Sequence, residues 1–172
     1  MAGKLRSTTM TMPDDQVSAR LRDHCAVDRH RDALHLPQWS LDDWSALLAL
    51  AREVRLDSAA VLIRAGQTEN SLYLVVSGGL EVRQGQPGDA FGTLQRERFG
   101  AIIGEISFFD DGARSATVWA TEASRLLEFD RAAVMSFATQ YPTRGLELLF
   151  ALGRVMAWRM RRNEARRGAS AG

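Results

Sequence analysis

The sequence predicts a mainly β protein with flanking helices: a β-roll, or double-stranded jelly roll, with N-terminal helices and a C-terminal helix pair. One observation is a change of hydrophobic period, because from Leu56 onward apolar residues recur at about every second position in short runs. Another is the regular punctuation of these runs by glycine-containing turns, as in sandwiches and jelly rolls. The expected strands are residues 62–63, 72–76, 80–82, 92–97 and 116–129, the last broken at 121–124, and the expected turns are residues 66, 78–79 and 84–89.

The chain divides into three predicted parts. Residues 1–37 form an N-terminal arm, partly helical or mobile, in which residues 16–36 have the alternating charges of a polar helix. Residues 38–141 form the β-roll domain, and residues 142–172 form a C-terminal helix and basic tail. An ordered segment, residues 37–55, leads into the roll with Ser40 as a helix N-cap. Its apolar residues at helical spacing are Trp44, Leu47, Leu48 and Ala51.

Two helices are predicted after the last strand. Asp130 is the expected N-cap of a short helix, Tyr141 and Pro142 interrupt it, and Thr143 caps a longer helix that ends near Arg167. The apolar residues of the longer helix cover more than one face, which indicates a second burial surface and therefore a homodimer through this helix. These residues are Leu146, Leu148, Leu149, Phe150, Leu152, Gly153, Val155, Met156, Ala157 and Met160.

Six arginines lie between the middle and the end of this helix, and two interpretations of them stay open. They are a solvated helix end that complements the helix dipole, or a surface for nucleic acid, anionic lipid or an acidic partner. The six are Arg154, Arg159, Arg161, Arg162, Arg166 and Arg167.

Composition limits the classes of protein that this chain can be. With 172 residues, 45% hydrophobic and a net charge of +1, it is an ordinary globular chain without the charge of a polyanion-binding protein. Cys25 is the only cysteine, which excludes an intrachain disulfide and fits a reducing, cytoplasmic compartment. We expect neither a signal peptide nor a membrane span. No metal is expected, because His24, Cys25, His30 and His35 lack a recognised ligand spacing.

Residues 100–120 have the composition of a cassette for one small anion. Gly104 lets the backbone approach a ligand closely, and Glu105 is a carboxylate suited to accept hydrogen bonds from a sugar diol. Arg114 offers a planar fork of donors for a phosphate. The Ser115 hydroxyl and the amides of Ser115 and Ala116 can converge on the same oxygens. A short helix beginning near Glu105 would point its N-terminus at the ligand as well.

These residues resemble the phosphate-binding cassette of cyclic nucleotide-binding domains. Gly104–Glu105 and residues 114–118 carry the resemblance, and residues 61–67 and 71–78 are similar to the strands that precede the cassette in that family. The resemblance implies that Glu105 binds the ribose hydroxyl and that Arg114 binds the cyclic phosphate. The implied ligand-binding set is Ile103, Gly104, Glu105, Ile106, Ser107, Arg114, Ser115 and Ala116.

Two details of the resemblance concern the base and the family pattern. Ile103 stands where the family usually has Phe or a small polar residue. Ser115 is compatible with cAMP and cGMP, and we favour cAMP. Apolar cover for the base could come from Val61, Leu62 and Leu74, although their alternation fits plain core better.

The resulting prediction is a cytoplasmic, non-enzymatic cyclic nucleotide sensor without a prosthetic group. It is expected to signal to an effector in trans through its C-terminal helices. Asp110–Asp111 fits a turn better than a catalytic pair. Sequence-specific DNA binding is not expected, because residues 161–172 are too few for a helix-turn-helix. The alternative is an adaptor that keeps the fold and uses no ligand. The effector's identity, and whether ligand activates or releases it, are not encoded in these patterns.

Overall fold

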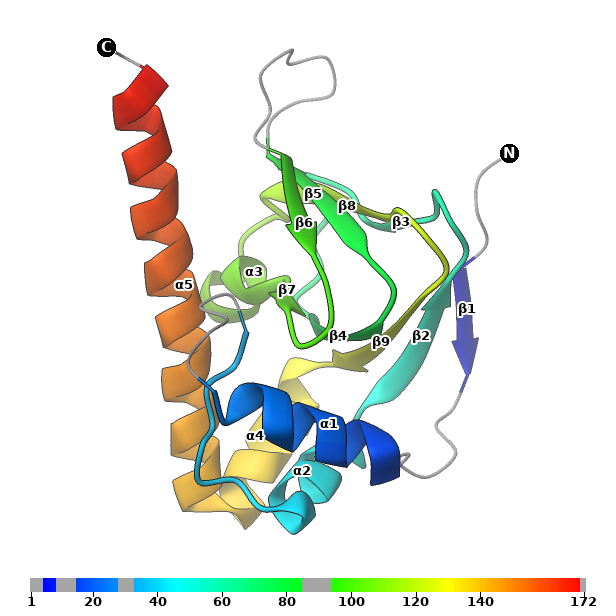
Figure 1. Ribbon diagram of the computed structural model, residues 1–172, viewed down its shortest axis with the longest axis vertical. Coiled ribbons are helices and arrows are strands. Elements are labelled where there is room, and N and C mark those ends of the chain that lie inside the picture. Colours follow the sequence, from blue (N-terminus) through cyan, green and yellow to red (C-terminus); the bar gives the residue numbers. More distant parts are fainter. Residues whose placement is uncertain (1–4, 9–14, 28–32, 85–93, 171–172) are drawn as a thin grey trace.

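The computed structural model describes residues 5–8, 15–27, 33–84 and 94–170. Two antiparallel sheets form a jelly roll, helices α1, α2 and α4 gather at one end, and α5 runs along the side (Figure 1). This arrangement confirms the predicted fold class. The predicted turn at residues 84–89 lies almost wholly outside the described residues.

The two sheets contain nine strands in the described part of the chain. The five-stranded sheet has the order β1 (Leu5–Thr8), β2 (Arg52–Leu56), β9 (Ser124–Phe129), β4 (Leu72–Ser77) and β7 (Ile102–Ile103). The four-stranded sheet has the order β3 (Val61–Ile63), β8 (Ala116–Ala120), β5 (Leu80–Gln84) and β6 (Leu94–Glu97). The break predicted at 121–124 separates β8 from β9, while β1, β2 and β7 were not predicted.

Strand β4 separates two hydrophobic cores, because successive side chains of a strand point to opposite faces. Leu72, Leu74 and Val76 belong to the core formed with the helices. Tyr73 and Val75 belong to the core between the sheets. A continuous apolar run is therefore the expected sequence for this strand, which is buried on both faces.

The helices at the end of the roll are α1 (Asp15–Cys25), α2 (Leu41–Leu48) and α4 (Arg131–Gln140). Ser40 and Asp130 cap α2 and α4 as predicted, each accepting a hydrogen bond from a backbone amide of the first turn. The helix expected over residues 16–36 is wrong in length, because α1 ends at Cys25. Val17, Leu21 and Cys25 are buried in the helical core.

The division of the chain into arm, roll and tail stays a prediction.

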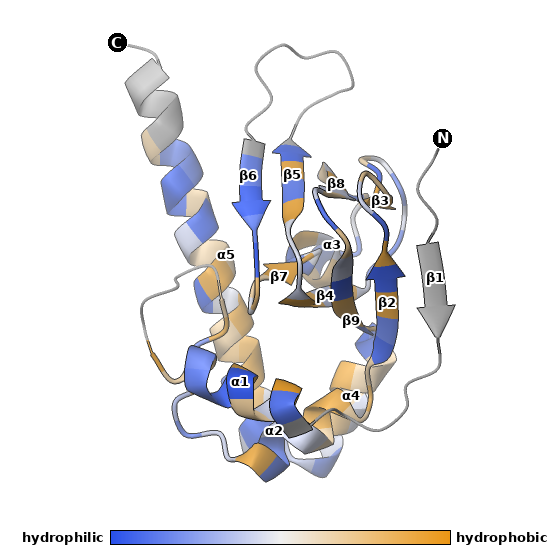
Figure 2. Cartoon of the chain, turned by 45° about the vertical axis from the view of Figure 1, so that its right-hand side comes forward, coloured by the Kyte–Doolittle hydropathy of each residue, from blue (hydrophilic) through white to orange (hydrophobic). Residues whose placement is uncertain are grey.

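The last helix, α5 (Pro142–Ser170), begins one residue before the predicted cap Thr143. Proline suits the first helical position, because an amide N–H there has no partner within the helix and proline lacks this group. Figure 2 shows apolar residues in the half of α5 near α1 and α4 and polar residues nearer β6. Leu148, Leu152 and Val155 are buried, whereas Leu146 is 60% exposed and Phe150 is 75% exposed. The helix thus has one face on the domain and a second apolar face that the described residues leave exposed.

No helix in the described ranges combines the length and apolar character needed to cross a membrane.

Candidate ligand-binding site

The centre of the site is the junction between β7 and the short helix α3 (Glu105–Asp110). Gly104 precedes the helix with φ of 86°, in the left-handed region that favours glycine. A Cβ at this position would lie 2.5 Å from Nη1 of Arg114 and 2.7 Å from the carbonyl oxygen of Ser71. The absence of a side chain at Gly104 therefore lets Arg114 lie directly against the backbone.

Arg114 is buried, with 4% of its surface exposed. Its Nη1 donates hydrogen bonds to Ser107 Oγ at 2.7 Å and to the Gly104 carbonyl oxygen at 3.2 Å. Its Nη2 donates to the Ser71 carbonyl oxygen at 3.0 Å. The guanidinium also lies over the ring of Tyr73, 5.8 Å from the centroid. These contacts hold the guanidinium in one orientation.

The hydrogen-bond partners of Arg114 among the described residues are neutral oxygens, and Arg114 forms no ion pair with a carboxylate there. Burying a charge without a counterion costs free energy. An anion bound beside Arg114 would supply that counterion. The arrangement is therefore chemically suited to hold a phosphate-like anion.

A cavity of about 520 Å³ opens beside Arg114, within the range typical of small-molecule sites. All of the predicted ligand-binding residues line this cavity: Ile103, Gly104, Glu105, Ile106, Ser107, Arg114, Ser115 and Ala116. Ser107 and Glu105 are buried, whereas Ser115 is exposed. The structure thus brings the predicted set together, and its role in binding stays a prediction.

The cavity has further lining residues that sequence reasoning missed or assigned to other roles. Ile63, Val82 and Val118 line it from the roll, and Met156 and Met160 line it from α5. Leu62 and Leu74, considered as cover for a base, belong instead to the hydrophobic cores. Polar lining residues that were not predicted are Gln95, Glu97, Arg159 and Asn163.

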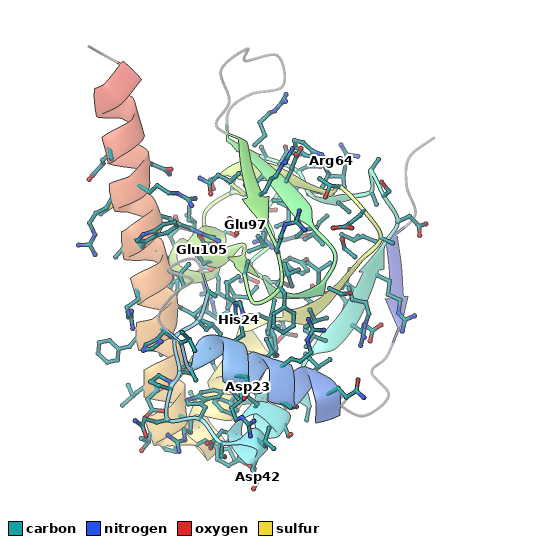
Figure 3. All side chains as sticks on the ribbon, in the orientation of Figure 1. Asp23, His24, Asp42, Arg64, Glu97 and Glu105 are labelled. Atoms are coloured by element: carbon teal, nitrogen blue, oxygen red, sulfur yellow. The ribbon has the colours of Figure 1, made fainter. Side chains whose placement is uncertain are left out.

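Arg159 connects α5 to the cavity. Its Nη1 donates to Glu105 Oε1 at 2.7 Å, and its Nη2 donates to Glu97 Oε1 at 3.2 Å. Figure 3 shows Glu97 and Glu105 between the strands and α5. The interpretation of all six arginines as a solvated helix end is therefore wrong for Arg159. A signal was present, because residue 159 continues the buried series 148, 152 and 155 at helical spacing.

Asp110 and Asp111 have structural roles at the end of α3. Asp110 Oδ1 accepts a hydrogen bond from the Gly112 amide at 2.8 Å. Asp111 Oδ2 lies 2.7 Å from Nη1 of Arg131, the first residue of α4. This ion pair lowers the pKa of Asp111. The two carboxylates therefore act as helix-end and inter-helix contacts, as expected for a turn.

In the described part of the chain, no group of three His, Cys, Asp or Glu side chains could hold a metal ion; His30 lies outside it. Burial raises the pKa of the Cys25 thiol to about 12, which keeps the thiol protonated.

Comparison with known proteins identifies related sequences. The family model described as "Cyclic nucleotide-binding domain" matches residues 53–141. A CRP-like cAMP-activated global transcriptional regulator of Mycobacterium tuberculosis is 26% identical over 121 residues, which are 69% of this chain and 52% of that protein. Lysophospholipase nte1 of Neurospora crassa is 28% identical over 108 residues, which are 63% of this chain and 7% of that protein. The chain thus spans only part of these curated relatives.

Solved structures share the fold. A cyclic nucleotide-binding domain from Methylobacillus flagellatus has a TM-score of 0.75 at 20% identity, covering 94% of this chain and 86% of that one. The catabolite activator protein of Thermus thermophilus has a TM-score of 0.66 at 21% identity, covering 78% of this chain and 61% of that one.

Proposed function

The chain belongs to the cyclic nucleotide-binding domain family, and from this premise we propose that it is a cytoplasmic cyclic nucleotide sensor that signals to a partner through its C-terminal helices. The observation that carries the proposal is Arg114, a buried guanidinium held by neutral oxygens beside a cavity of about 520 Å³. A cyclic phosphate is an anion of the size and geometry that this donor fork recognises.

Each part of the nucleotide has a proposed position. The cyclic phosphate binds Arg114 and the amides of Ser115 and Ala116, and the ribose hydroxyl donates to Glu105. The base lies between the roll and α5, where Val82 and Met160 supply apolar cover. Binding that differs between two arrangements of α5 would shift the helix, as any ligand-driven change requires.

We propose cAMP in preference to cGMP as the ligand. The mycobacterial relative is described as cAMP-activated, which supports this choice. We also propose that the chain binds its ligand without transforming it. The lysophospholipase of Neurospora crassa is named as an enzyme, but this chain corresponds to 7% of that protein.

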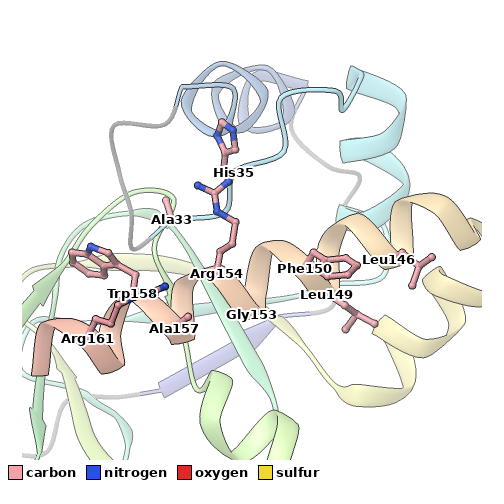
Figure 4. Close-up of a pocket in the computed structure, with 10 residues that line it drawn as sticks. All are labelled: Ala33, His35, Leu146, Leu149, Phe150, Gly153, Arg154, Ala157, Trp158 and Arg161. Atoms are coloured by element: carbon pink, nitrogen blue, oxygen red, sulfur yellow. The ribbon is translucent and has the colours of Figure 1, made fainter. Parts of the chain in front are cut away.

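The uncovered face of α5 is the proposed homodimer surface. Leu146, Phe150, Gly153 and Ala157 follow one another at intervals of four and three residues along a hollow of about 680 Å³. Such spacing places the four residues on one side of the helix, as in a coiled coil. Figure 4 shows the lining residues of this hollow along α5, with Arg154 pointing toward His35.

The rival proposal is an adaptor that retains the fold and uses no nucleotide. Thermal unfolding with and without cAMP or cGMP separates the two, because a ligand at 100 times its dissociation constant adds about 2.7 kcal/mol to the free energy of unfolding. A rise in Tm with either nucleotide supports the sensor. An unchanged Tm with both nucleotides at millimolar concentration supports the adaptor.

A further inference from the structure

Glu97, the last residue of β6, is a buried carboxylate beside the proposed nucleotide cavity. Only 2% of its surface is exposed, and it lies opposite Leu80 in the β5–β6 pairing. Removing a carboxylate from water costs several kcal/mol unless it is well paired. An apolar residue at position 97 would fill the same space without this cost. The charge at residue 97 therefore needs a reason other than packing.

The contact of Glu97 with α5 supplies that reason. Glu97 Oε1 accepts a hydrogen bond from Arg159 Nη2 at 3.2 Å, and the Arg159 side chain is only 13% exposed. The other end of the same guanidinium is bound to Glu105. A planar guanidinium held at both ends has little freedom, so the two carboxylates fix the position of this part of α5.

The proposed ligand would contact Glu105 but not Glu97. Glu105 is the group assigned to the ribose hydroxyl, so its bond to Arg159 is shared with or weakened by the ligand. Glu97 has no such assignment and can keep Arg159 in place when the nucleotide is bound. Met156 and Met160 lie on the same helix as Arg159 and form one wall of the cavity.

We propose that Glu97 is a positioning residue that holds Arg159, and with it α5, over the nucleotide cavity, so that its loss opens the cavity and speeds ligand release. Only the effect of Glu97 on ligand release rests on the proposed function. The docking of α5 by Glu97 is a property of the ligand-free chain and can be measured separately.

The ligand-free test is hydrogen exchange of backbone amides in the full chain. Glu97→Gln keeps the side-chain volume and removes the charge. We expect faster exchange over residues 153–163 in this variant. Glu122→Gln removes the same charge from an exposed ion pair with Arg98 at 3.8 Å, on the turn between β8 and β9, and should leave these amides unchanged. Equal protection of residues 153–163 in Glu97→Gln and wild type overturns the proposal, whether or not the chain binds nucleotide.

The ligand test is the dissociation rate of a fluorescent cAMP analogue. Glu97→Gln should raise this rate about tenfold, which is the scale of one charged hydrogen bond. In an Arg159→Gln background the same change should have no further effect, because Glu97 acts through Arg159. Slower or unchanged release in Glu97→Gln, or an equal increase in both backgrounds, overturns the proposal. If the wild type binds neither cAMP nor cGMP, the proposed function fails and hydrogen exchange alone decides the role of Glu97.

Discussion

A Cβ at Gly104 would lie 2.5 Å from Nη1 of Arg114, so the lack of a side chain at Gly104 decides whether Arg114 can occupy its place. The left-handed φ of Gly104 turns the chain from β7 into α3. The same turn presents the Gly104 carbonyl oxygen to Arg114. The proposed anion site is therefore built by backbone geometry as much as by charged side chains.

Gly104→Ala tests this dependence. The variant combines an unfavourable φ with a collision against Arg114 and Ser71, and we expect a loss of about 1–3 kcal/mol in the free energy of unfolding together with weaker nucleotide binding. Gly66→Ala is the matched control, because Gly66 has the same φ of 86° and nothing within 4 Å of its Cβ position. Urea denaturation measures both variants. Equal losses in both would mean that the close approach to Arg114 adds nothing.

The Cys25 thiol should be unreactive in the folded chain. Its pKa of about 12, against 9.0 for a free thiol, lowers the thiolate fraction near pH 8 by about three orders of magnitude. Alkylation by iodoacetamide should therefore follow unfolding. Rapid labelling of the native protein at pH 8 would contradict the buried position of Cys25.

The same shift predicts a dependence of stability on pH. The folded-state pKa of the Cys25 thiol lies above its unfolded-state pKa of 9.0, so its contribution to stability is complete below about pH 9 and is lost as the pH rises toward 12. Cys25→Val should remove this part of the alkaline decline. Denaturant unfolding of wild type and Cys25→Val between about pH 7 and 10 measures this dependence, because free thiols ionise in that range. Parallel declines in both would contradict the assignment.

The proposed dimer depends on the exposed face of α5. Phe150→Asp should give monomers while changing the stability of the monomer little, because Phe150 is 75% exposed. Sedimentation at micromolar concentration measures the mass. Met135→Asp, on α4 and 56% exposed, is the matched control and should leave the dimer intact. A wild type that sediments as a monomer with and without nucleotide would contradict the proposal.

Local patterns were enough to predict the roll and the cassette. The period-two runs gave most strands, and the spacing of Gly104, Glu105 and Arg114 pointed to one cavity, because each signal depends on a few neighbouring residues. Strand β2 was missed, since its five residues begin soon after the end of α2 and its partner β9 lies about seventy positions later. Helical spacing with residues 148, 152 and 155 could have placed Arg159 on the buried side of α5. Its partners Glu105 and Glu97 lie 54 and 62 positions earlier in the chain, and no local pattern pairs residues at that separation.

Isothermal calorimetry of cAMP binding to wild type and to Arg114→Gln tests the central claim most directly. The account predicts binding to the wild type and a loss of about 1.5–3 kcal/mol in the variant, the range for a charged hydrogen bond. Arg64→Gln removes an exposed arginine of the same charge and should bind like the wild type. Equal affinity of Arg114→Gln and wild type would contradict the assignment of Arg114 as the receptor for the phosphate.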